Sequence, residues 1–187
     1  MSWVKIEEPD PASDTVRVEA QSKGAARFAR EEGIWAADDS VYFDCTTGGA
    51  AGQGQLWRYR PTGAGSGVLT LVYESEGEDD LDNPDNVVIV PKTGHVFLQE
   101  DGDDSQFVRG VTPRGGIYDF AEAVLEPESE FCGGCFSPDG KTLFLNQQGD
   151  RQDGSPAEVG SDPANPPAGS AAYTYAIWGP FARANSV

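Results

Sequence analysis

The chain has 187 residues, enough for one domain with a sizeable hydrophobic core. Its 31 acidic residues outnumber 13 basic ones, and the formal net charge of -18 argues against nucleic acid as a partner, because phosphate contacts need clustered lysines and arginines. No apolar run approaches the ~18 residues of a membrane span, so we expect no membrane partner.

The acidic surplus has two interpretations, and both can hold for different residues. The first is a solvated acidic surface. The second is that some carboxylates converge on cations, since Ca²⁺ takes several carboxylate and carbonyl oxygens. Three cysteines are too few for a disulfide scaffold. The first residues lack the basic and apolar regions of a signal peptide, and the compartment is left unassigned.

Three segments repeat along the chain, at Glu32 to Gly49, Asp85 to Gly102 and Gly133 to Asp150. Each has a short apolar strand, a turn, and a second apolar strand that ends in polar residues. Their starts are spaced by 53 and then 48 residues. The turns are "ADDS", "PKTGH" and "SPDGK", which are rich in turn-forming residues. The pattern predicts three β-hairpins in a chain without long helices.

Further strands follow each hairpin. A third strand ending in proline follows all three, as "QLWRYRP", "SQFVRGVTP" and "AYTYAIWGP", and a fourth follows twice, as "GVLTLVYES" and "GIYDFAEAV". Four short antiparallel strands repeated about every 50 residues are typical of β-propeller blades. We therefore predict an all-β fold with about three four-stranded blades in a single domain over 1–187. Their approximate limits are residues 28–80, 81–127 and 128–187.

The predicted blades do not close a ring, because propellers have ~4 to 8 of them. The chain is therefore expected to form part of a larger ring, and "SWVKIEEPDP" near the N-terminus is a candidate strand of another blade. The innermost strand of a blade starts near the central channel, so residues at these starts can meet. They are Arg30 to Glu32, then Asp85 and Asn86, then Gly133 and Gly134.

Several collinear motifs resemble the C-terminal half of the PhoX-like alkaline phosphatases. They are "FAREEG", "VYFDCTTGG", "GQLWRYRP", "NPDNVVIVPKTGHVFLQEDG" and "EFCGGCFSPDGKTLFLNQQ", with "WVKIEEPDP" and "YAIWGPF" near the two ends. The resemblance implies half of a six-bladed propeller, with calcium and iron at the channel mouth, and hydrolysis of phosphate monoesters. Members of that family are typically exported to the periplasm or the medium.

The resemblance also suggests site residues. In "FAREEG", Arg30 would clamp phosphate and Glu32 would bind metal, and residues two apart on a strand point the same way. "PDN" resembles a calcium-binding loop of gluconolactonase-like propellers, which makes Asp85 and Asn86 candidate ligands. Glu100, in "EDG", is a further metal candidate. A metal cluster would polarise the phosphoryl group and position the nucleophile.

Other features have plain structural interpretations beside the functional ones. The acidic run from Glu76 to Asn86 suits Ca²⁺ but also a solvated turn. Cys132 and Cys135 have the spacing of a weak zinc or redox motif, and a pair of packed thiols is the simpler interpretation. His95 is the only histidine and falls in a predicted turn, which argues against Ser-His-Asp and Cys-His catalysis. Trp35, Trp57 and Trp178 are expected to pack between blades.

The sequence thus predicts a metal-dependent phosphatase that acts on phosphate esters. It would need a second chain or self-association to close its ring. The alternative is a non-catalytic calcium-binding or structural propeller piece that needs a partner chain. Lactone hydrolysis is a third hypothesis that only "PDN" suggests.

Overall fold

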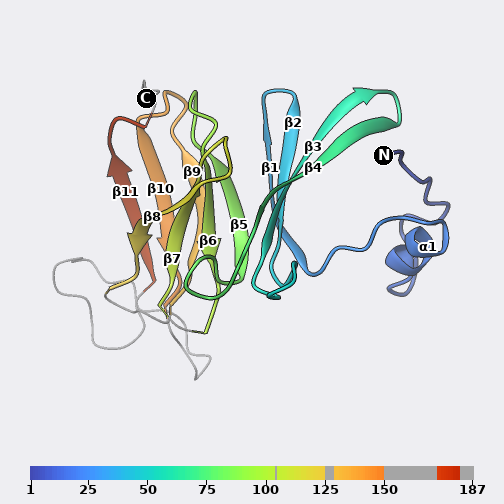
Figure 1. Ribbon diagram of the computed structural model, residues 1–187, viewed down its shortest axis with the longest axis horizontal. Coiled ribbons are helices and arrows are strands. Elements are labelled where there is room, and N and C mark those ends of the chain that lie inside the picture. The colour runs from blue at the N-terminus through green and yellow to red at the C-terminus, as the bar shows by residue number, and fades with distance from the viewer. Residues whose placement is uncertain (104, 125–128, 150–171, 182–187) are drawn as a thin grey trace.

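The computed structural model describes residues 1–103, 105–124, 129–149 and 172–181, and these form three antiparallel sheets, none of them closed (Figure 1). The first sheet holds β1 (Glu31–Ala37), β2 (Ser40–Cys45), β3 (Gln55–Gly63) and β4 (Ser66–Glu74). The second holds β5 (Pro84–Ile89), β6 (Val96–Glu100), β7 (Phe107–Val111) and β8 (Ile117–Glu122). The third holds β9 (Phe131–Phe136), β10 (Thr142–Gln147) and β11 (Tyr173–Trp178). The all-β prediction and the order of strands are confirmed.

The first strands of the three sheets lie side by side in the order β1, β5, β9, with the later strands of each sheet further out (Figure 1). In β5 the residues point alternately to either side: Val87 and Ile89 face the first sheet, and Val88 faces the third. Because both faces of β5 are covered, its sequence is a continuous apolar run rather than an alternating one.

Two hydrophobic clusters hold the sheets together. Between the first and second sheets lie buried side chains that include Leu56, Leu81 and Leu98. Between the second and third lie others that include Leu143 and Leu145. Full burial of each such side chain contributes roughly 1.5–3 kcal/mol, so the stacking of sheets is the main source of stability.

The predicted turn chemistry is visible in the hairpin between β9 and β10. Asp139 Oδ1 accepts hydrogen bonds from the Ser137 hydroxyl at 2.7 Å and from the Lys141 N–H at 3.1 Å. Gly140 has φ of 70°, a conformation that glycine adopts without steric cost. "SPDGK" therefore fixes this hairpin locally, before any contact between sheets.

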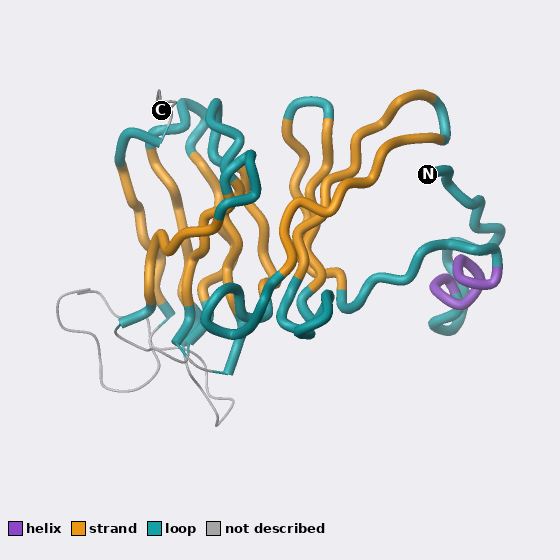
Figure 2. Tube along the Cα trace, in the orientation of Figure 1, coloured by secondary structure: helices purple, strands orange, loops and turns teal. Residues whose placement is uncertain are grey.

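One expectation was wrong. The N-terminal segment does not form a blade strand: among the described residues it meets the first sheet at an isolated bridge between Ser2 and Ser66 and through Trp3, whose Nε1 donates a hydrogen bond to the Tyr59 hydroxyl at 2.9 Å. It is followed by α1 (Val16–Ser22), which was not predicted (Figure 2). Trp178 is 78% exposed on the free face of the third sheet, so its expected packing between blades stays a prediction. None of the described segments forms a helix with the length and hydrophobicity of a membrane span.

Candidate metal centre

The first strand of each sheet begins in the same way. The carbonyl groups of Arg30, Asn83 and Glu130 accept the N–H groups of Thr46, Asp101 and Gln148, at 2.9, 3.0 and 3.0 Å. These hydrogen bonds tie the residue just before each first strand to the end of the second. They show that the three strand starts are structurally equivalent.

The equivalence places Glu32, Asp85 and Cys132 at matching positions, each the second residue of its strand. The spacing of the repeated segments predicted Gly133 at this position, one residue too late. A β-bulge follows within each strand start, at Glu32 and Gly33, at Asp85, and at Gly133 and Gly134. Bulges re-aim side chains and are common beside active sites.

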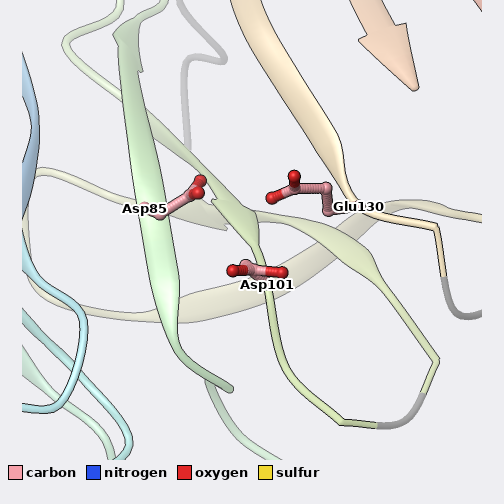
Figure 3. Close-up of side chains that lie close together, drawn as sticks. All are labelled: Asp85, Asp101 and Glu130. Carbon is pink, nitrogen blue, oxygen red and sulfur yellow. The ribbon is translucent and has the colours of Figure 1, made fainter. Parts of the chain in front are cut away.

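Three carboxylates converge at this end of the sheets. Asp85 comes from β5, Asp101 follows β6, and Glu130 precedes β9, and one oxygen of each lies within 4.8 Å of the others (Figure 3). We call these three residues the acidic cluster. It joins the second sheet to the third, and Asp85 is the residue of the acidic cluster that was predicted to lie at a strand start.

The charges in the acidic cluster repel one another. Burial and the nearby charges of Asp101 and Asp85 raise the pKa of Glu130 to about 8. Burial and the charge of Asp85 also raise the pKa of Asp101. Oε2 of Glu130 is buried and receives no hydrogen bond from the described residues. Such a group is costly without a proton or a cation beside it.

Asn86 links the acidic cluster to the next strand. Its Nδ2 donates a hydrogen bond to Asp85 Oδ1 at 2.7 Å, and its Oδ1 accepts one from the Gly133 N–H at 3.1 Å. The first bond orients the Asp85 carboxylate, and the second holds the bulge of β9 against β5. The structure therefore shows Asn86 as a neighbour of the acidic cluster that positions Asp85.

Arg30 and Glu32 lie at the border of the acidic cluster. The Arg30 guanidinium is 3.7 Å from Glu32 Oε1, and the two side chains are 56% and 45% exposed. Burial raises the pKa of Asp101, and the charge of Arg30 opposes that shift. The exposed Arg30 guanidinium keeps hydrogen-bond donors for an anion beside its pair with Glu32.

Glu100 is surrounded by donors of the protein. Its Oε1 accepts hydrogen bonds from the Asp82 N–H at 2.9 Å and from Arg109 Nε at 2.7 Å, and its Oε2 accepts one from the Phe107 N–H at 3.1 Å. Arg109 also pairs with Asp119. Glu100 is fully buried, and burial raises its pKa to about 7 although these donors oppose the shift. It ties together the segments on which Asp85 and Asp101 lie.

A buried carboxyl group lies beneath the border of β1 and β5. Asp44 is fully buried, and its Oδ1 accepts a hydrogen bond from the Gly33 N–H at 2.9 Å, whereas Oδ2 has no partner among the described residues. Burial raises its pKa to about 7, and the charges of Asp85 and Glu32 add to the shift. Asp44 therefore belongs electrostatically to the same region as the acidic cluster.

The cysteines and the histidine are placed differently. Cys132 and Cys135 are both free, and the bulge at Gly133 and Gly134 lies between them. Burial and the charges of Glu130 and Asp85 raise the pKa of the Cys132 thiol. His95 Nδ1 lies 2.8 Å from the Tyr118 hydroxyl, in the turn that leads into β6.

Sequence reasoning did not single out Glu130 or Asp44. Glu130 opens "EFCGGCF", and its position just before an inner strand was the available signal, since Arg30 precedes β1 in the same way. No sequence signal marks Asp44, because its role depends on the close approach of β5 to Gly33. A Cβ on Gly33 would lie 2.7 Å from the Val87 nitrogen and 2.8 Å from Asn86 Cα.

The residues present fit a hard divalent cation. Three carboxylates within reach of one another, one with a buried oxygen that lacks a hydrogen bond, supply the oxygen donors that Ca²⁺ prefers.

Comparison with known proteins agrees with this arrangement. No curated protein matches the sequence significantly. The family model described as "Alkaline phosphatase PhoX" matches residues 1–150, which include all three residues of the acidic cluster. The chain therefore belongs to the PhoX alkaline phosphatase family.

Proposed function

We propose that this chain provides part of the active site of a metal-dependent phosphatase that hydrolyses phosphate monoesters. The observation that carries the proposal is the acidic cluster, three carboxylates from two sheets that meet beside an exposed arginine in a chain of the PhoX family. In this proposal the chain corresponds to the C-terminal half of a PhoX enzyme.

Each residue has a role in this proposal. Asp85, Asp101 and Glu130 hold a cation, calcium by the preference of their oxygen donors, and iron is a second metal that the family resemblance implies. Glu32 adds a carboxylate from β1. A bound cation would polarise the phosphoryl oxygens. Arg30 binds the phosphate oxygens beside it, since guanidinium and phosphate form paired hydrogen bonds.

Asn86 and Glu100 then act as positioning residues. Asn86 orients Asp85 through its amide. Glu100 has hydrogen bonds to both of its oxygens, so Asp101, the next residue, takes the ligand position that the sequence suggested for Glu100. At the end of β6, the Glu100 carboxylate thus stabilises the fold, and the Asp101 carboxylate binds the cation.

We further propose that the three sheets are blades of a propeller, with limits near residues 28–80, 81–127 and 128–187, and that further blades complete the ring. The support is the repeated stacking of first strands and the apolar residues on the two free faces. Ile34 is 67% exposed on the first sheet, and Phe144 is 41% exposed on the third. A second chain or a second copy of this chain would cover these faces.

Hydrolysis of p-nitrophenyl phosphate tests the proposal. The purified chain is assayed with calcium and iron supplied and then chelated, beside Glu130→Gln and the control Asp79→Asn, which removes an exposed carboxylate outside the acidic cluster. Metal-dependent turnover should be lost in Glu130→Gln and kept in Asp79→Asn. Turnover that is equal in all three proteins would contradict the assignment of the acidic cluster.

Thermal unfolding with added calcium gives a second readout that does not need catalysis. A cation held by the acidic cluster should raise the melting temperature, with about 2.7 kcal/mol of stabilisation at a concentration 100 times Kd. Glu130→Gln should abolish most of that rise. A rise without turnover would support the non-catalytic calcium-binding alternative, and size-exclusion chromatography with light scattering would report whether copies associate.

A further inference from the structure

A cavity of about 230 Å³ lies between the first and second sheets, away from the acidic cluster. One wall is the inner face of the first sheet, where Tyr42, Arg58 and Thr70 occupy neighbouring strands in register. The other wall is formed by turns of the second sheet, with Thr112 and Arg114 among its residues. The acidic cluster is at the start of β5, and these turns are at the opposite strand ends, so the two places are separate.

The cavity is walled by packed backbone. A Cβ on Gly115 would lie 3.4 Å from the Val72 carbonyl oxygen, and one on Gly94 would lie 3.6 Å from the Pro113 ring. The turn that carries Arg114 therefore rests against both β4 and the turn before β6. This packing fixes the distance between the two walls, so the arginines are brought to one cavity by the fold.

Charge distinguishes this cavity from the rest of the molecule. The protein carries a formal net charge of -18, yet no acidic residue lines the cavity, and two arginines do. Neither Arg58 nor Arg114 forms an ion pair among the described residues. Arg58 is half-buried and Arg114 is exposed at the mouth of the cavity. A half-buried arginine such as Arg58 is usually paired with a carboxylate, because removal from water is costly.

Arg109 shows what a paired arginine looks like in the same fold. It lies on β7, the third strand of the second sheet, as Arg58 lies on β3, the third strand of the first. Arg109 faces inward and has both Glu100 and Asp119 as partners. Arg58 is half-buried on the inward face of its sheet and has hydroxyl groups around it instead of carboxylates.

We propose that this cavity, which we call the arginine pocket, binds a small oxyanion of the phosphate type. Guanidinium groups recognise phosphate oxygens through paired hydrogen bonds, and the hydroxyls of Tyr42, Thr70 and Thr112 add neutral donors. The volume admits inorganic phosphate or the phosphate group of a small ester. The proposal requires no metal and does not depend on the proposed phosphatase activity.

Calorimetric titration of the whole chain with inorganic phosphate tests the arginine pocket. A chelator is present throughout, so that a cation in the acidic cluster cannot supply the binding. We expect saturable binding by the wild-type protein, and about tenfold or greater loss of affinity in both Arg58→Gln and Arg114→Gln, since each removes a charge-assisted contact. Circular dichroism of each variant confirms that it is folded.

Arg60→Gln is the matched control. Arg60 lies on the same strand, two residues beyond Arg58, is exposed, and does not line the arginine pocket. It should bind phosphate with wild-type affinity, whereas equal weakening in all three variants would mean that only net charge matters and would overturn the proposal. Absence of binding to the chelated wild-type protein at about 10 mM phosphate would also overturn it.

Discussion

Asp44→Asn isolates the cost of one buried carboxylate beneath the candidate metal centre. The substitution keeps the size of the side chain and the oxygen that accepts the Gly33 N–H. It removes the negative charge that Asp85 and Glu32 repel. The change in stability that it causes should therefore depend on pH in a way that the structure predicts.

The sign follows from the direction of the pKa shift. Burial raises the pKa of Asp44 from 3.8 to about 7 in the folded protein. At a pH between these two values, the folded state therefore keeps a proton on Asp44 that the unfolded state has released. The stability that this proton supplies is greatest at low pH and is lost as the pH rises through about 7. Between pH 5.5 and 8.5 the wild-type protein should lose about 2 kcal/mol through this group.

Urea denaturation at these two pH values, with a chelator present, measures the effect. Asp44→Asn has no such proton and does not lose this stability. Its free energy of unfolding minus that of the wild type should therefore rise by about 2 kcal/mol between pH 5.5 and pH 8.5. The absolute stability of the variant is not the test, because an amide in this place has its own hydrogen-bond needs.

The exposed Asp79 is the control for the charge change alone. Asp79→Asn should differ from wild type by the same amount at both pH values, within about 0.5 kcal/mol. If the difference between Asp44→Asn and wild type were also the same at both pH values, the argument that burial and repulsion hold a proton on Asp44 would be refuted.

Two further substitutions test how the strands and segments are held in place. Gly33→Ala should lower the free energy of unfolding, measured by urea denaturation, by about 1–3 kcal/mol, because the new Cβ would lie 2.7 Å from the Val87 nitrogen of β5. The control Gly77→Ala, which has open space around it, should lower it far less. Equal losses in the two variants would contradict the close approach of β1 and β5. Arg109→Met should lower the free energy of unfolding by about 3–5 kcal/mol, because it leaves the buried Glu100 carboxylate without its guanidinium partner. A loss below about 1 kcal/mol would show that the ion pair is not needed for stability.

The sequence was sufficient to predict the three hairpins, because each carries its own turn chemistry. "SPDGK" folds through the contacts of Asp139 within a few residues, and these are visible in the order of residue types. Helix α1 was not predicted, because seven residues between loops give too short a stretch for a helical period to appear.

The candidate site was only partly predictable. Asp85 was expected at a strand start and lies in the acidic cluster, whereas Glu130 was overlooked. The bulges shift the alignment of the strands, because each adds unpaired residues. The bulge follows the first residue pair in β5 but the second residue pair in β9. Residue types do not mark where strand pairing is interrupted, so the repeat predicted Gly133 at the position that Cys132 occupies. The assignments of Arg30, Glu32, Asp85, Asn86 and Glu100 to catalytic or metal-binding roles stay predictions.

The shared construction of the strand starts has a consequence for how such a site can change over evolution. Glu32, Asp85 and Cys132 occupy one equivalent position in three sheets, within a bulge for Glu32 and Asp85 and directly before one for Cys132, and ahead of the apolar residues that pack between sheets. A substitution there exchanges one chemical group for another while the packed part of the strand keeps its residues. The fold therefore separates the residues that maintain it from those that select a ligand, and three positions can vary in chemistry without a new scaffold.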